Sequence, residues 1–178
     1  MSPGIVLREG LDADVPAIAA IYAHAVETGR ASFELEPPGV EAMRARRAAL
    51  VASGHPYLVA ELDGAVAGYA YAGPYRPRPA YRHTVENSVY VRPDRQGLGL
   101  GRRLLDALVA DAEARGFRQM IAVIGDSANA ASIRLHEAAG FAMVGTLKSV
   151  GRKHGVWLDT VLMQRALGPG DADPPTRG

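Results

Sequence analysis

The sequence predicts a single-domain α/β protein in which helices flank a mixed, mostly antiparallel twisted sheet. Three observations support this fold class. Helical and strand-like hydrophobic patterns alternate along the chain, and Asp63-Gly64 between two strand-like segments is typical of an antiparallel hairpin. A strand–helix–strand–helix segment, residues 85–139, requires one parallel crossover. The 178 residues suffice for one domain but not for two ordinary ones.

The composition excludes several functional classes. A formal net charge of +1 offers no bulk attraction to nucleic acid or to a membrane, so neither partner is expected. The absence of cysteine excludes disulfides, cysteine nucleophiles and thiolate metal sites. The histidines show no ligand spacing, so we expect no metal site. Without an apolar leader, a cytoplasmic location is the default expectation.

The first half of the chain is expected to contain the hairpin and two helices. Asp12 or Asp14 is expected to cap the first helix. Arg44, Arg46 and Arg47 on the second helix are expected to form a solvated face. The expected elements are, in order, a strand Ile5–Arg8, a helix through Val26, a loop Gly29–Gly39, a helix Glu41–Ser53, strands Tyr57–Leu62 and Ala65–Ala72, and a loop Gly73–Arg82.

The second half is expected to contain the crossover and a final antiparallel pair. The run Gln119–Ile124 does not alternate, which predicts a strand covered on both faces. The expected elements are a strand Val85–Val91, a helix with a seam at Leu104, Leu105 and Leu108, the strand Gln119–Ile124, a helix Ala130–Ala139 capped by Asn129, and strands Ala142–Leu147 and Val156–Met163. We expect the domain to span residues 1–167 and residues 168–178 to form a disordered tail.

A glycine-rich turn between the strand Val85–Val91 and the following helix is the clearest binding motif. Its glycines, Gly97, Gly99 and Gly101, leave backbone N–H groups unpaired at the positive end of a helix dipole, which suits a phosphate. The dinucleotide pattern G-x-G-x-x-G fails, because Leu104 or Arg102 stands where the third glycine is required. The Lys-Ser/Thr of a P-loop is also missing.

The turn, Gln96-Gly-Leu-Gly-Leu-Gly101, resembles the acyl-CoA loop of the GCN5-related N-acetyltransferases (GNAT family). The segment from Asn129 to Phe141 is similar to a second element of that family. The resemblance implies the GNAT fold and acetyl-CoA as acetyl donor. In this family the turn holds the pyrophosphate, and the preceding strand pairs with the pantetheine arm. Arg102 and Arg103, at the start of the helix, would add positive charge to the pyrophosphate site. The implied cofactor contacts are Val89, Tyr90, Val91, Gln96, Gly97, Leu98, Gly99, Leu100, Gly101, Arg102, Asn129 and Ser132.

One position departs from the family pattern. His136 stands where the family usually has a tyrosine that protonates the departing thiolate. An imidazole could serve as that acid, because its pKa lies near neutrality. The alternative is a histidine held within a helix interface.

A more specific resemblance covers nearly all of the chain expected to be ordered. Thr84–Val91, Arg134–Glu137 and Lys153–Asp159 are similar to segments of phosphinothricin and methionine sulfoximine acetyltransferases. The resemblance implies acetylation of the α-amino group of a small amino-acid analogue: phosphinothricin, methionine sulfoximine or methionine sulfone. It also implies a homodimer with the substrate near the subunit interface. Trp157 is expected in the core or in dimer packing.

Acetyl transfer to an amine requires a base, and Glu86 is the best candidate. It lies on the strand that would border the acetyl group, and a glutamate in a half-buried strand is unusual. Because an α-amino group has a pKa of about 8, a modest base suffices, directly or through water. A structural ion pair is the alternative.

The substrate acid group requires a cation, preferably a guanidinium. The resemblance puts an aromatic-Arg-Pro element in the substrate loop, which makes Arg76 the first choice, with Arg82 and Tyr75 nearby. The remaining expected substrate contacts are Val85 beside Glu86, and Phe33 and Glu34 on the opposite wall, for which an ordinary solvated loop is the alternative.

Two other functions remain open from the sequence. One is acetylation of a polyamine or of a protein N-terminus. A polyamine enzyme should have an acidic groove, whereas the loops near Glu86 carry arginines. The other is a non-catalytic acyl-CoA-binding module on the same fold.

Overall fold

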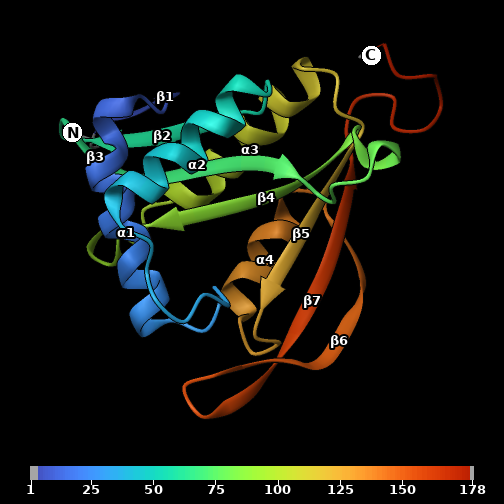
Figure 1. Cartoon of the computed structure of the whole chain (residues 1–178). Coiled ribbons are helices and arrows are strands. Elements are labelled where there is room, and N and C mark those ends of the chain that lie inside the picture. Colours follow the sequence, from blue (N-terminus) through green and yellow to red (C-terminus); the bar gives the residue numbers. More distant parts are fainter. Residues whose placement is uncertain (1–3, 177–178) are drawn as a thin grey trace.

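The computed structural model describes residues 4–176 as a seven-stranded sheet with helices on both faces (Figure 1). The strand order is β1-β2-β3-β4-β5-β7-β6. Every neighbouring pair is antiparallel except β4 and β5, which are parallel. The predicted fold class is therefore confirmed, including its single crossover.

The first half of the chain forms the predicted hairpin and both predicted helices. The hairpin turn at Asp63 and Gly64 has φ angles of +53° and +78°, and a type I′ turn requires positive φ at both of these positions. The elements are β1 (Ile5–Glu9), α1 (Val15–Thr28), α2 (Val40–Ala52), β2 (Tyr57–Leu62) and β3 (Ala65–Pro74).

The second half follows the predicted order, with a longer final hairpin than the sequence indicated. Asn129 caps α4 as predicted, since its Oδ1 accepts a hydrogen bond from the Ser132 N–H at 3.2 Å. The elements are β4 (Thr84–Val91), α3 (Leu100–Ala114), β5 (Gln119–Gly125), α4 (Ala130–Ala138), β6 (Ala142–Lys153) and β7 (Val156–Ala166).

The two faces of the sheet carry different helices. The helices α1 and α2 cover one face, and α3 and α4 cover the other (Figure 1). The α3 seam of Leu104, Leu105 and Leu108 is fully buried against the sheet, as its spacing predicts. Alternation along β4 therefore divides its side chains: Val85 packs in the α3 core, whereas Glu86 faces the α1 side.

The parallel pairing of β4 with β5 ends early. It covers Thr84–Asn87 against Gln119–Ala122, and beyond this point each strand pairs only with its other neighbour. The carboxyl-terminal ends of the two strands therefore separate and leave an opening in the sheet. This opening lies between α4 and the loop that follows α1.

Several local expectations require correction. Asp14 occupies the N-cap position of α1 without capping it, because its carboxylate binds Arg8 and the Leu11 N–H instead. The strand β5 is not covered on both faces, since Val123 is 39% exposed. Trp157 is 65% exposed, so the expectation that it packs in the core is wrong.

The last turns of the chain contact Arg118, whose guanidinium donates to the carbonyls of Gly170 and Pro174.

Residues 177 and 178 of the expected tail lie outside the described residues. Within residues 4–176, none of the helices has the length and apolar character that crossing a membrane demands.

The Arg8–Asp14 ion pair generates a stability prediction. The Arg8 guanidinium lowers the pKa of Asp14, so this contribution is complete above the unfolded carboxyl pKa of about 3.9 and is lost as the pH falls through the lower folded pKa. We expect Asp14→Asn to lower the free energy of unfolding at pH 7 by about 1–3 kcal/mol, measured by urea titration, because a buried acceptor is weakened. Asp12→Asn, at an exposed carboxylate, is the control. Equal stability of both variants would contradict this account.

Candidate active site

Glu86, Ser88 and Tyr90 project from the α1 side of β4 into a cavity of about 380 Å³. We call it the Glu86 cavity. Its other walls come from α1, the loop after α1, β3, β5 and β7, and its remaining lining residues are Tyr22, Ala31, Ser32, Phe33, Glu34, Tyr71, Val123, Gly125 and Thr160.

The Glu86 carboxylate is half-buried and forms no hydrogen bond or ion pair within residues 4–176. Burial raises its pKa above the ordinary carboxyl value, and the positive charge of Arg76 opposes that shift. The structural ion pair considered as an alternative for this residue is therefore not formed by the described residues. An unpaired carboxylate with a raised pKa is suited to exchange protons with a bound molecule.

The loop after α1 is fixed over this cavity by polar contacts. The Tyr22 hydroxyl lies 3.0 Å from both Ser32 Oγ and a Glu34 carboxylate oxygen. The Arg46 guanidinium forms an ion pair with Glu34 at 2.6 Å, and the buried Lys153 ammonium donates to the Ser32 carbonyl at 2.8 Å. Glu34 is thus held in place by these contacts.

Phe33 in the same loop packs onto two glycines. A Cβ added to Gly151 would lie 2.3 Å from the Phe33 ring, and one added to Gly125 would lie 2.3 Å from the Ala31 carbonyl oxygen. The absence of side chains at these two positions therefore allows the loop to approach the sheet. Phe33 and Glu34 both line the Glu86 cavity.

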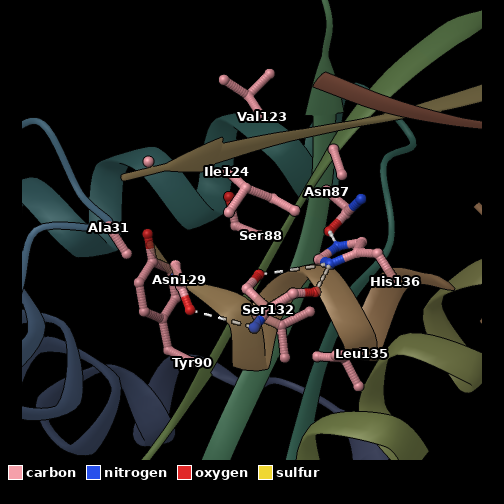
Figure 2. Close-up of a pocket in the computed structure, with 13 residues that line it drawn as sticks. Ala31, Asn87, Ser88, Tyr90, Val123, Ile124, Asn129, Ser132, Leu135 and His136 are labelled. Carbon is pink, nitrogen blue, oxygen red and sulfur yellow. Dashed lines mark hydrogen bonds between the residues drawn. The ribbon is translucent and has the colours of Figure 1, made fainter. Parts of the chain in front are cut away.

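A second, narrower cavity of about 90 Å³ occupies the opening between β4 and β5 (Figure 2). We call it the β4–β5 cleft. It adjoins the Glu86 cavity, because residues including Ala31, Ser88 and Tyr90 line both. On its other side the cleft is lined by Val89, Asn129, Ser132 and His136.

His136 is buried at the base of this cleft with both ring nitrogens engaged (Figure 2). Nε2 lies 3.0 Å from Asn87 Oδ1, and Nδ1 lies 2.8 Å from the Ser132 carbonyl oxygen. The Asn87 amide is oriented by donation from Nδ2 to the Ile121 carbonyl at 3.2 Å. A neutral imidazole has one N–H, so it can donate to only one of its two oxygen neighbours. The hydrogen bond with the Ser132 carbonyl favours the protonated ring, but burial has the larger effect. Burial therefore lowers the pKa of His136 and favours the neutral form.

The glycine turn presents an open backbone surface. Gly97 and Gly99 both have φ of +77°, and a Cβ at either position would meet nothing within 4 Å. Within the described chain, the N–H groups of residues 97–102 have no backbone or side-chain acceptor. Leu100 is buried in the core, so only its backbone faces the turn. These free N–H groups lie at the start of α3 and form a surface suited to an anion.

The other residues at the turn are more exposed. Gln96 and Leu98 lie at the surface, and Gly101 belongs to the first turn of α3. Arg102 is held by an ion pair with Asp106 at 2.6 Å.

The expected substrate residues are not all brought to the Glu86 cavity. The Arg76 guanidinium lies 5.2 Å from the centre of the Tyr75 ring, and its charge acts on Glu86. Tyr75 itself lines a separate pocket with Tyr81, and Arg82 is exposed. The side chain of Val85 is fully buried in the core on the opposite face of β4, so we remove it from the substrate set.

The arginines of α2 do not simply form the solvated face that the sequence predicts, because each of them contacts a partner in another segment. Arg44 pairs with Asp12, Arg46 with Glu34, and Arg47 donates to the Gly10 carbonyl at 2.7 Å.

The sequence did not single out several residues of the site, among them Asn87, Tyr22, Tyr71 and Lys153. Asn87 carried a usable signal, since it is a polar residue on the inward-facing side of a strand. Tyr22, Tyr71 and Lys153 carried none, because their roles depend on segments that are distant in the sequence.

Comparison with known proteins identifies the family. The model of the acetyltransferase (GNAT) family matches residues 18–141. The chain belongs to the GNAT family. It is therefore an N-acetyltransferase, and acetyl-CoA is its acetyl donor.

Three relatives of this GNAT acetyltransferase are especially similar. It is 58% identical to a phosphinothricin N-acetyltransferase of Alcaligenes faecalis, over 92% of this chain and 83% of the relative. It is 44% identical to an L-methionine sulfoximine/L-methionine sulfone acetyltransferase of Pseudomonas paraeruginosa, over 94% of this chain and 98% of the relative. A phosphinothricin acetyltransferase from Sinorhizobium meliloti, crystallised with AcCoA, superposes with a TM-score of 0.95 at 47% identity. The superposition covers 100% of this chain and 95% of that structure.

The packing of Phe33 on Gly151 generates a prediction about the Glu86 cavity. In Gly151→Ala, the added methyl group displaces the flexible ring, so we expect the fold to persist and Phe33 to move. The expected result is a fall of about tenfold or more in kcat/KM for the amine, with unchanged affinity for acetyl-CoA. Gly145→Ala on the same strand, where a Cβ meets nothing within 4 Å, is the matched control. Indistinguishable kinetics of the two variants would show that the position of Phe33 does not matter.

Proposed function

We propose that this GNAT acetyltransferase acetylates the α-amino group of a small amino-acid-like substrate, with Glu86 as general base. The observation that carries the proposal is the unpaired Glu86 carboxylate, half-buried in a cavity that adjoins the β4–β5 cleft. The relatives named for phosphinothricin, methionine sulfoximine and methionine sulfone support this substrate class.

The proposed acetyl-CoA site combines the glycine turn with the β4–β5 cleft. The free N–H groups of residues 97–102 would hold the pyrophosphate. The unpaired edge of β4 at Val89–Val91 would hold the pantetheine arm, with Asn129 and Ser132 on the other side of the cleft. When bound, acetyl-CoA supplies an acetyl group activated as a thioester.

The proposed chemistry is direct transfer. The Glu86 carboxylate takes a proton from the substrate ammonium, directly or through water, so that the free amine attacks the thioester carbonyl carbon. A backbone N–H within Val89–Val91 donates to the carbonyl oxygen as negative charge develops. The C–N bond would form first, and the C–S bond would break as the carbonyl is restored. The amine nitrogen would lose its second proton in this step, and the departing sulfur would receive one.

We propose that His136 protonates the departing sulfur as the imidazolium, which thereby returns to the neutral form that burial favours and is recharged by the second proton that the amine nitrogen loses. Because Asn87 and the Ser132 carbonyl occupy its ring nitrogens, the proton would reach the cleft through the Ser132 hydroxyl, which lies 3.5 Å from Nδ1. Asn87 would then orient the imidazole, although it does not touch the substrate.

The acid group of the substrate would be bound by Arg76. The Glu86 cavity itself is lined by Glu34 and Glu86 and, among the described residues, by no Lys or Arg. Arg46 balances the charge of Glu34, and the Arg76 guanidinium is close enough to act on Glu86. An uncompensated acidic lining would favour a polyamine, which makes polyamine acetylation the second candidate function.

We further propose that two copies associate through the outer surface of β6 and β7. Several large apolar side chains of these two strands are exposed, and exposed apolar surface is typical of a protein interface. They are Met143, Val144, Leu147, Val150, Val156 and Trp157. A cytoplasmic location remains a prediction of the sequence.

The role of Glu86 generates the first test. Because burial raises its pKa, the carboxylate becomes a base only as the pH rises through that raised value, so kcat/KM should rise across the same interval. We expect Glu86→Gln to lower kcat by about 10²–10⁴-fold and to remove this rise, with acetyl-CoA binding retained. The assay follows thiol release with methionine sulfoximine, phosphinothricin and spermidine as acceptors. Retained turnover in Glu86→Gln would reject the base, and preference for spermidine would favour the second candidate.

The glycine turn generates the second test. Gly99→Asp places a carboxylate beside the proposed pyrophosphate site, so acetyl-CoA affinity in calorimetry should fall by about tenfold or more. Gly64→Asp is the matched control, because Gly64 has nearly the same φ and equally open surroundings in a distant hairpin. Unchanged affinity in a folded Gly99→Asp would overturn the assignment of this turn.

A further inference from the structure

A third cavity, of about 400 Å³, lies between α2 and the strands β2 and β3. Its lining is mainly aromatic and aliphatic, and neither the sequence motifs nor the proposed function uses it. The side chains that line only this cavity, and not the Glu86 cavity, are Met43, Arg46, Ala49, Leu50, Ser53, Tyr57, Tyr69 and Pro74. We call it the apolar cavity. Its volume falls within the range of small-molecule sites.

The apolar cavity and the Glu86 cavity share a wall. Tyr22 and Tyr71 line both cavities, so their rings stand between the two spaces. The ion pair of Arg46 with Glu34 also spans this wall, because Arg46 lines one cavity and Glu34 the other.

Tyr22 and Tyr71 differ in the other contacts that their side chains form. The Tyr22 hydroxyl contacts Ser32 and Glu34, so removing its ring would release the loop over the Glu86 cavity. Tyr71 instead belongs to a row of rings on the sheet, with its centroid 5.3 Å from that of Tyr57 and their planes 8° apart. It lies opposite Ser88 in the β3–β4 register, beside the Glu86 cavity. Truncating Tyr71 would therefore open the wall while the loop contacts remain.

We propose that the apolar cavity is a closed-off extension of the substrate site, and that Tyr71 sets the largest substrate side chain the enzyme accepts. The ligand class for the opened cavity is an amino acid with a large apolar or aromatic side chain, such as tryptophan. The chemistry follows from the lining, since flat tyrosine faces and aliphatic groups favour an aromatic ring over a charged group. This inference rests on the proposed function, because it concerns the substrate of the same site.

The test compares two acceptors in a set of variants. The kcat/KM for L-tryptophan is divided by that for L-methionine sulfoximine. We expect Tyr71→Ala to raise this ratio by about tenfold or more, because space equal to several methylene groups becomes available. Tyr57→Ala is the matched control, since Tyr57 lines only the apolar cavity and its removal leaves the wall closed. Its ratio should stay at the wild-type value.

A second pair of substitutions checks that the gain uses the apolar cavity. In the Tyr71→Ala background, Ala49→Trp should fill the cavity and restore the wild-type ratio. Ala48→Trp at the neighbouring exposed position of α2, which does not line the cavity, should leave the raised ratio in place. Thermal unfolding and acetyl-CoA affinity establish that each variant is folded. If Tyr71→Ala does not fold, Tyr71→Leu should show a smaller rise in the same direction.

The outcomes separate this inference from the proposed function. Absence of wild-type turnover with any amino-acid amine would refute the proposed function and this inference together. Wild-type turnover of methionine sulfoximine, with an unchanged ratio in a folded Tyr71→Ala or an equal rise in Tyr57→Ala, would refute only the role of Tyr71.

Discussion

The early end of the β4–β5 pairing is the constraint on which the rest of the site depends. The two strands pair only as far as Asn87 and Ala122. At this end of the pairing, the Asn87 side chain on β4 donates a hydrogen bond to the Ile121 carbonyl on β5. The same side chain contacts His136 on α4, so one residue connects two strands and a helix where the sheet divides. Beyond it, β4 has an unpaired edge, and the β4–β5 cleft occupies the space that a continued ladder would fill.

The alternation of side chains along β4 then distributes the chemistry between the two faces. Odd-numbered positions from Val85 to Val91 face α3 and α4, where they complete the core or, at Asn87, orient His136. Even-numbered positions from Glu86 to Tyr90 face α1 and line the cavity proposed for the amine. A single strand therefore separates the proposed base from the proposed acid, with the cleft between them. The same period of two excludes Val85 from the substrate cavity.

Much of this arrangement could be predicted from the sequence because its signals are local. The hairpin at Asp63-Gly64, the cap at Asn129 and the glycine turn depend on backbone angles and spacings within a few residues. The pleat of β4 also placed Glu86 and Asn87 on opposite faces. The walls of the cavities could not be predicted in this way. Tyr22, Tyr71 and Lys153 meet the site only after α1, β3 and β6 have packed together, and no local pattern encodes those contacts.

Acetyl-CoA is proposed to bind in the opening of the sheet and at the free N–H groups beside it. Amide hydrogen exchange with and without coenzyme A tests this most directly, because the N–H groups of residues 97–102 have no acceptor within the described chain. We expect exchange at these amides and at Val89–Val91 to slow when coenzyme A binds. Saturating coenzyme A that leaves exchange at the turn unchanged and protects a different surface would contradict it.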